Sequence, residues 1–165
     1  MVENVLEQLI DLFKKGQAQF RVLEHAAGGK SSQSVAEIRG TELGQGAKAL
    51  VCHVKGNGVK LYVLAVPADK QADLAKLAQA LGGRRASLAS PDEVKELTGC
   101  VFGAVPPVSL HPDLKLVADP SLYERYDELA FNAGLLDHSI IIKTEDYKRI
   151  VHPELIEFLK DNSPS

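Results

Sequence analysis

The chain contains no tryptophan, and its aromatic residues are only five phenylalanines and four tyrosines. Proteins that bind long single-stranded nucleic acids stack successive bases on aromatic side chains, so this scarcity argues against such a platform. No charge of one sign dominates either, since the formal net charge is −3. That balance excludes a broadly basic surface but leaves room for a local basic pocket.

Cysteine is equally scarce. Cys52 and Cys100 lie far apart, each inside an apolar run, and no Cys-x-x-Cys pair is present. This pattern argues against a zinc site built from cysteines and against a disulfide framework. We interpret both as buried structural thiols. The five histidines are scattered, with none at helical metal-ligand spacing, so we expect no metal and no cofactor.

No apolar run approaches the length of a membrane span, and the N-terminus lacks the features of a signal peptide. We therefore expect a cytoplasmic protein without a membrane partner. A chain of 165 residues with 45% hydrophobic content fits one domain over residues 1–165. An N-terminal helix over residues 2–15 and a frayed tail at 162–165 would form its ends.

Periodicity predicts a mixed α/β domain: a single, largely antiparallel sheet flanked by helices. The Asn57-Gly58 turn between two apolar runs indicates a hairpin. Asp69 is expected to cap the next helix, and Ser90 with Glu93 forms a capping box for another. The expected strands cover residues 20–24, 49–54, 61–66, 84–88, 100–102, 114–119, 128–131 and 139–143. The expected helices cover 32–39, 74–81, 91–98 and 144–150, with a last one starting at Pro153.

Two loops next to apolar strands have unusual backbones, one rich in glycine and the other containing glycine and proline. The first is the glycine-punctuated loop at 44–46, where Lys48 sits just as the next apolar strand begins. An unpaired lysine is costly to bury, so its ammonium must reach a cleft, a carboxylate or the surface. The second segment runs from Gly103 to Pro106 and Pro107. Its rigid backbone could hold a water or an oxyanion, although a plain strand-ending turn is the alternative.

Polar residues at other strand ends are weaker signals. His25 follows Glu24 at the end of the first expected strand, where either a functional or a capping histidine would fit. No nucleophile elbow, HExxH or GxGxxG motif is present. The residues taken alone therefore indicate two candidate functional loops and one lysine at a loop–strand junction, but they do not identify a reaction.

The ordered combination of these segments resembles the YbaK/ProX aminoacyl-tRNA deacylase family, and within it the subgroup called YeaK. Members of this family are related to the editing domain of bacterial prolyl-tRNA synthetases. The resemblance covers roughly residues 20 to 150. It is carried by Gly44-Gln45-Gly46-Ala47-Lys48-Ala49-Leu50-Val51, Phe102-Gly103-Ala104-Val105-Pro106, Glu24-His25, Leu81-Gly82-Gly83, Ser90-Pro91 and Asn132-Ala133-Gly134. The chain departs from many members by having Phe102 in place of a first glycine and a second proline at Pro107.

The resemblance implies hydrolysis of the ester that joins a wrong amino acid to the 3′-terminal adenosine of tRNA. By resemblance, Lys48 would hold the terminal phosphate, and the loop of Gly103 and Pro106 would place the ester carbonyl and a water. A hydroxyl of the tRNA itself would take part in catalysis. The residues that resemblance assigns to substrate binding are His25, Asn132, Ala133, Gly134 and Ser139. Lys30, Lys55, Arg84 and Arg85 are weaker candidates for a basic rim, with an ordinary solvated surface as the alternative.

We therefore expect a free-standing trans-editing hydrolase for small polar residues, such as seryl- or threonyl-tRNA. Its partner would be the tRNA acceptor end, and an aminoacyl-tRNA synthetase or an elongation factor is a further candidate. Two alternatives stay open: a non-catalytic module that binds tRNA ends or a synthetase, and a small-molecule binder that uses the same pocket.

Overall fold

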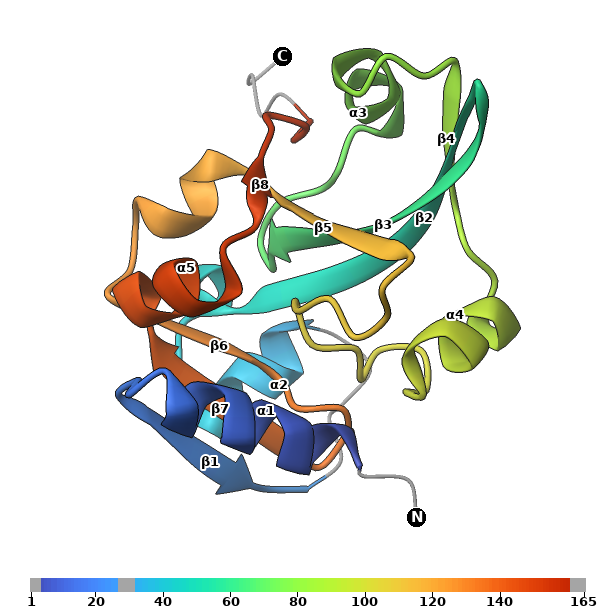
Figure 1. Ribbon diagram of the computed structural model, residues 1–165. Helices are drawn as coiled ribbons and strands as arrows, with labels where there is room; N and C mark the ends of the chain where they lie inside the picture. Colours follow the sequence, from blue (N-terminus) through green and yellow to red (C-terminus); the bar gives the residue numbers. More distant parts are fainter. Residues whose placement is uncertain (1–3, 27–31, 161–165) are drawn as a thin grey trace.

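Figure 1 shows the computed structural model, which describes residues 4–26 and 32–160. Helices and strands alternate irregularly along the chain, as expected for a mixed α/β fold. The helices are α1 (Val5–Lys15), α2 (Ser32–Arg39), the 3₁₀ helix η1 (Leu43–Gln45), α3 (Leu74–Ala80), α4 (Pro91–Thr98), the 3₁₀ helix η2 (Pro120–Tyr123) and α5 (Thr144–Val151). The strands are β1 (Phe20–Glu24), β2 (Ala47–Gly56), β3 (Gly58–Pro67), β4 (Arg85–Leu88), β5 (Leu114–Ala118), β6 (Glu128–Asn132), β7 (His138–Lys143) and β8 (Glu154–Leu155).

The strands form two sheets, which corrects the expectation of a single one. The smaller sheet has the order β1-β7-β6 and is antiparallel throughout. The larger has the order β4-β2-β3-β5-β8, in which β2 pairs antiparallel with β3 and β4, and β5 pairs parallel with β3 and β8. A parallel bridge between Gly46 and Ala130 joins the start of β2 to β6. The two sheets therefore meet where the glycine loop enters β2.

Helices cover both faces of the smaller sheet. Figure 1 shows α1 across one face and α2 on the other. Asn4 caps α1 by accepting a hydrogen bond from the backbone N–H of Glu7, and Leu9 and Phe13 are buried against the sheet. Because side chains alternate along a strand, residues of β6 and β7 that do not face α1 face α2.

The structure confirms the predictions that depend only on residues close together in the sequence. The hairpin turns at Asn57, with Gly56 paired to Gly58, and Gly58 has φ +88°. A glycine there avoids the strain that a side chain would meet in the left-handed region. Ser90 and Glu93 form the expected capping box of α4. Both cysteines are buried, and burial raises the pKa of Cys52 to about 12, which fits a structural thiol.

Three sequence-based expectations are wrong. The helix cap is Asp73 rather than Asp69. Residues 100–102 are not a strand but belong to the same loop as Gly103 to Pro106, because the adjoining prolines lack the N–H groups that a ladder needs. No helix starts at Pro153 in the described chain; residues 154–155 form β8, which adds to the free edge of β5. The tail at 162–165 lies outside the described residues.

Candidate active site

Lys48 lies on the face of β2 that continues into the α2 side of the smaller sheet. The parallel bridge pairs Gly46 with Ala130. Two residues further along each strand, Lys48 and Asn132 share that face, because side chains alternate with a period of two. Burial lowers the pKa of half-buried Lys48, and the charge of Asp69 raises it. The structure thus brings together two of the predicted site residues, one cationic and one amide.

Asn132, Ser139 and His25 form one hydrogen-bonded network through Arg39, which the sequence analysis did not single out. Arg39 Nε donates to Ser139 Oγ at 2.8 Å, and Arg39 Nη2 donates to Asn132 Oδ1 at 2.9 Å. His25 Nε2 lies 2.8 Å from Ser139 Oγ. Residues from β6, β7, α2 and the end of β1 therefore meet at one point.

The glycine–proline loop lies beside the turn between β6 and β7. Gly134 N–H donates to Ala104 O at 3.0 Å, and the turn and the loop are thereby joined. Gly103 has φ +90°, a conformation in which glycine avoids steric strain. Pro106 is buried, whereas the side chain of Phe102 is 60% exposed. The loop is anchored on its proline side and open at Phe102.

A small cavity of about 20 Å³ connects the loop to the strand of Lys48, about enough for one water molecule. Its lining is largely apolar and comes from β2, the end of β4, α4 and the loop. The lining residues are Ala49, Leu50, Val51, Leu88, Ala89, Val94, Phe102, Gly103 and Val105. Ala49 and Val51 alternate with Lys48 along β2 and face the apolar core that holds Val105, so this cavity does not place Gly103 beside Lys48.

Two predicted pocket residues have mainly structural positions. The Ala133 side chain is fully buried in the apolar core shared with α1. Gly134 lies against α1, since a Cβ at this position would be 2.7 Å from Val5 Cβ. The turn of Asn132, Ala133 and Gly134 thus presents only the Asn132 side chain to the Arg39 network.

Tyr147 holds the far side of the loop, and nothing in the sequence motif indicated this role. Its hydroxyl donates to Pro107 O at 2.5 Å, and the side chain is fully buried. Burial raises the pKa of this hydroxyl well above its ordinary value, so it stays a donor at neutral pH. The contact fixes the carbonyl next to Pro106 to the body of the protein.

Tyr147→Phe is expected to lower the free energy of unfolding by about 1–3 kcal/mol, because the buried Pro107 carbonyl loses its partner. Tyr123→Phe is the matched control: within the described chain, the buried Tyr123 hydroxyl has no hydrogen-bond partner. Removing it should leave stability unchanged or raise it slightly. Urea unfolding of both variants measures the difference, and equal stability of the two would contradict the anchoring role of Tyr147.

Asp69 and Arg125 brace the glycine loop in front of Lys48. Arg125 donates to both carboxylate oxygens of Asp69, at 2.8 and 2.7 Å, and this hydrogen bonding is the main cause that holds the pKa of Asp69 below its ordinary value. Gly44 fits between them, since a Cβ there would lie 3.0 Å from Arg125 Nη1 and from Asp69 Oδ2. Asp69 therefore orders the loop instead of capping α3.

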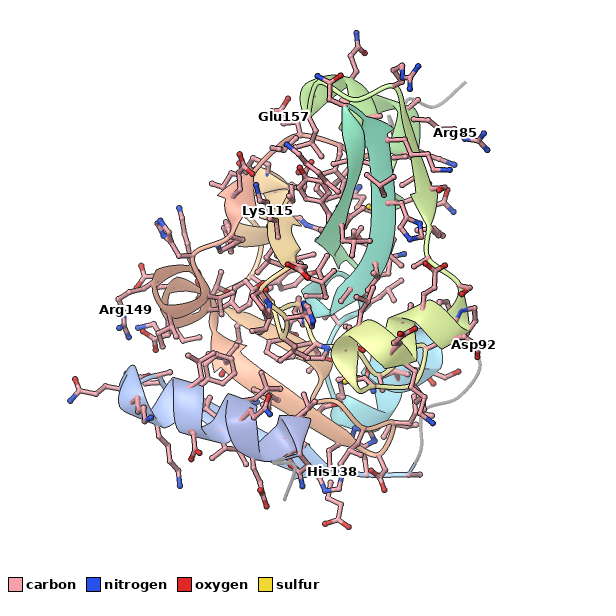
Figure 2. The ribbon with its side chains drawn as sticks, turned by 45° about the vertical axis from the view of Figure 1, so that its right-hand side comes forward. Arg85, Asp92, Lys115, His138, Arg149 and Glu157 are labelled. Carbon is pink, nitrogen blue, oxygen red and sulfur yellow. The ribbon has the colours of Figure 1, made fainter. Side chains whose placement is uncertain are left out.

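The proposed basic rim does not gather at this site. Lys55 pairs with Arg85 at the far end of the hairpin, and Figure 2 shows Arg85 at the tip of the larger sheet. Lys55 is seven residues from Lys48, which corresponds to about 23 Å along a strand. Lys30 lies outside the described residues.

Residues 4–26 and 32–160 contain no cluster of histidine, cysteine or acidic side chains that could hold a metal ion. In the same part of the chain, no helix has both the length and the apolar character needed to cross a membrane.

Comparison with known proteins assigns the family. Residues 26–150 match the aminoacyl-tRNA editing domain. The multifunctional Ser/Thr-tRNA deacylase ProXp-y of Escherichia coli (strain K12) is 65% identical over 153 residues, which cover 92% of this chain and 91% of that protein. A proline–tRNA ligase of Bacillus cereus (strain AH820) is 35% identical over 60 residues, or 36% of this chain and 11% of the ligase.

Solved structures agree on the fold. The crystal structure of a proposed trans-editing enzyme for prolyl tRNA synthetase has a TM-score of 0.79 at 24% identity, covering 98% of this chain and all of that one. The crystal structure of hypothetical protein APE2540 has a TM-score of 0.81 at 22% identity, covering 93% of this chain and 99% of that one. Together with the sequence matches, they confirm the resemblance drawn from the motifs, and the chain belongs to the aminoacyl-tRNA editing domain family.

Proposed function

We propose that this protein is a free-standing hydrolase that deacylates mischarged aminoacyl-tRNA, with seryl- and threonyl-tRNA as its substrates. The observation that carries the proposal is the 65% identity, over 92% of the chain, to a relative named as a Ser/Thr-tRNA deacylase. The site geometry supports it, because half-buried Lys48 and the polar network of Arg39, Asn132 and Ser139 share one face of the joined sheets.

In the proposed reaction a water oxygen attacks the ester carbonyl carbon. The bond to the ribose oxygen of the terminal adenosine then breaks, that oxygen takes a proton, and the free amino acid leaves. Lys48 supplies a flexible point charge for the terminal phosphate. Within the described chain, no backbone acceptor pairs with the N–H groups of Gly103 or Val105, so these groups are available to hold the ester oxygen as charge develops.

The remaining proton transfer is assigned to the substrate. The charge of Asp69 raises the pKa of Lys48, but both carboxylate oxygens of Asp69 accept hydrogen bonds from Arg125. We assign the guidance of the water to a hydroxyl of the terminal ribose, as the family resemblance implies. A protein that uses its substrate in this way needs only to bind and orient the tRNA end.

A panel of mischarged tRNAs tests the proposal. We expect seryl- and threonyl-tRNA to be hydrolysed well above their spontaneous rates, whereas the same tRNA with its cognate amino acid is spared. Tight binding of the panel without turnover would instead support the non-catalytic module that binds tRNA ends. A synthetase or an elongation factor as partner, and a cytoplasmic location, belong to the same proposal.

A further inference from the structure

Arg39 is a half-buried cation whose partners within the described chain are neutral oxygens. Its Nε and Nη2 groups donate to the side chains of Ser139 and Asn132. Burial lowers the pKa of Arg39 to about 10, yet the guanidinium remains charged at neutral pH. No carboxylate in the described residues forms an ion pair with it. A buried charge of this kind is costly unless its donors find acceptors.

Arg39 also fixes the direction of every hydrogen bond in the network. A guanidinium only donates, so Ser139 Oγ and Asn132 Oδ1 accept from it, and Asn132 Nδ2 donates to Leu135 O at 3.2 Å. His25 Nδ1 lies 2.7 Å from Ala26 O, which can only accept. In neutral His25 the proton is therefore on Nδ1, and Ser139 donates its hydroxyl hydrogen to Nε2.

The Nη1 group of Arg39 is left for a ligand. No described residue accepts a hydrogen bond from it. It lies on the Lys48 face of the joined sheets, since a Cβ at Gly46 would be 3.6 Å from Arg39 Nη1. Gly46 itself is closely packed, since the same Cβ would lie 3.1 Å from Ala68 Cβ and 3.3 Å from Leu43 O. Ser139 Oγ and Asn132 Oδ1 each already accept one hydrogen bond from Arg39, and the Ser139 side chain is fully buried.

We propose that Arg39 Nη1 donates a hydrogen bond to the side-chain hydroxyl of the aminoacyl group, and that Arg39 thereby selects seryl- and threonyl-tRNA over analogues without the hydroxyl. This assignment rests on the proposed function. The aminoacyl ester has no free carboxylate, and Lys48 is the cation on this face that suits the phosphate. An alanyl group would leave this donor without a partner in the complex, which disfavours that substrate.

The test compares Arg39→Met with the wild type on seryl-tRNA and alanyl-tRNA made from the same tRNA. We expect the kcat/KM for seryl-tRNA divided by that for alanyl-tRNA to fall about tenfold or more in the variant. Most of this change should come from a lower kcat/KM for seryl-tRNA. Arg149→Met is the matched control. Arg149 bonds Asp146 and Gly16 O at the surface, and Figure 2 shows it on α5. This control should keep the wild-type ratio.

Other outcomes overturn the assignment. An equal loss on both substrates, with a shallower dependence on salt, would mean that Arg39 contacts a phosphate. An equal loss with a lower Tm and an unchanged salt dependence would mean that it only holds α2 to the sheet. Should the methionine variant fail to fold, Arg39→Lys keeps the charge but not the planar fork. That variant should also lose the preference for seryl-tRNA, and an unchanged ratio would contradict the proposal. A wild-type protein without deacylation would refute the proposed function instead.

Discussion

Lys48→Met is expected to lower kcat/KM for seryl-tRNA by about 100-fold while leaving the fold intact. The substitution removes a charged hydrogen bond, worth about 1.5–3 kcal/mol, and keeps most of the aliphatic stem. Because burial lowers the pKa of the half-buried Lys48 side chain, replacing it by an apolar chain of similar length should not lower Tm. Steady-state deacylation and thermal unfolding measure the two effects separately.

A matched control separates a specific contact from a general loss of positive charge. Lys115 is exposed on β5, as Figure 2 shows, and Lys115→Met should leave deacylation unchanged. If Lys48 contacts a phosphate, its removal should also reduce the slope of binding against salt by about one counterion. Wild-type turnover in the Lys48 variant would remove this residue from the active site.

Gly134→Ala is expected to lower the free energy of unfolding by about 2–4 kcal/mol. Gly134 has φ +87°, where a side chain costs about 1–2 kcal/mol. A Cβ would also lie 2.7 Å from Val5 Cβ and Cγ1, so α1 would have to move away from the sheet, with an overpacking cost of about 1–3 kcal/mol. The same shift would strain the hydrogen bond from Gly134 N–H to Ala104 O.

Gly82→Ala isolates the contribution of the backbone. Gly82 has φ +75°, but a Cβ there would meet no atom within 4 Å. The free energy of unfolding of Gly82→Ala should therefore fall only by the backbone strain, about 1–2 kcal/mol. Denaturant unfolding of both variants gives the difference. Equal losses would show that the contact between Gly134 and Val5 is not tight in solution.

The sequence predicts the parts of this fold that depend on neighbouring residues. The capping box of Ser90 and Glu93 and the turn at Asn57 each need only a few adjacent positions. Asp69 and Asp73 show the limit of this reasoning. Both precede the same helix, but Arg125, far along the chain, binds Asp69 and leaves Asp73 as the cap. Such a choice between two nearby acids is made by tertiary contacts.

Resemblance predicted several residues of the site, but not Arg39, which holds two of them in place. Lys48, Asn132 and Ser139 belong to matched motifs or follow one closely, and the structure places them around one face. Arg39 lies one residue before Gly40 at the end of a short polar helix, where an exposed arginine favouring the helix C-terminus would be the ordinary interpretation. Only the fold shows that its half-buried guanidinium bonds Asn132, 93 positions away in the sequence, and Ser139, 100 positions away.

The release of free serine from seryl-tRNA by the wild-type protein tests the central claim most directly. The measurement follows the amino acid and the tRNA together, against the spontaneous rate of ester hydrolysis. We predict catalytic release of serine with a full-length tRNA that can be charged again. Release no faster than the spontaneous rate, or cleavage of the tRNA chain, would contradict the account.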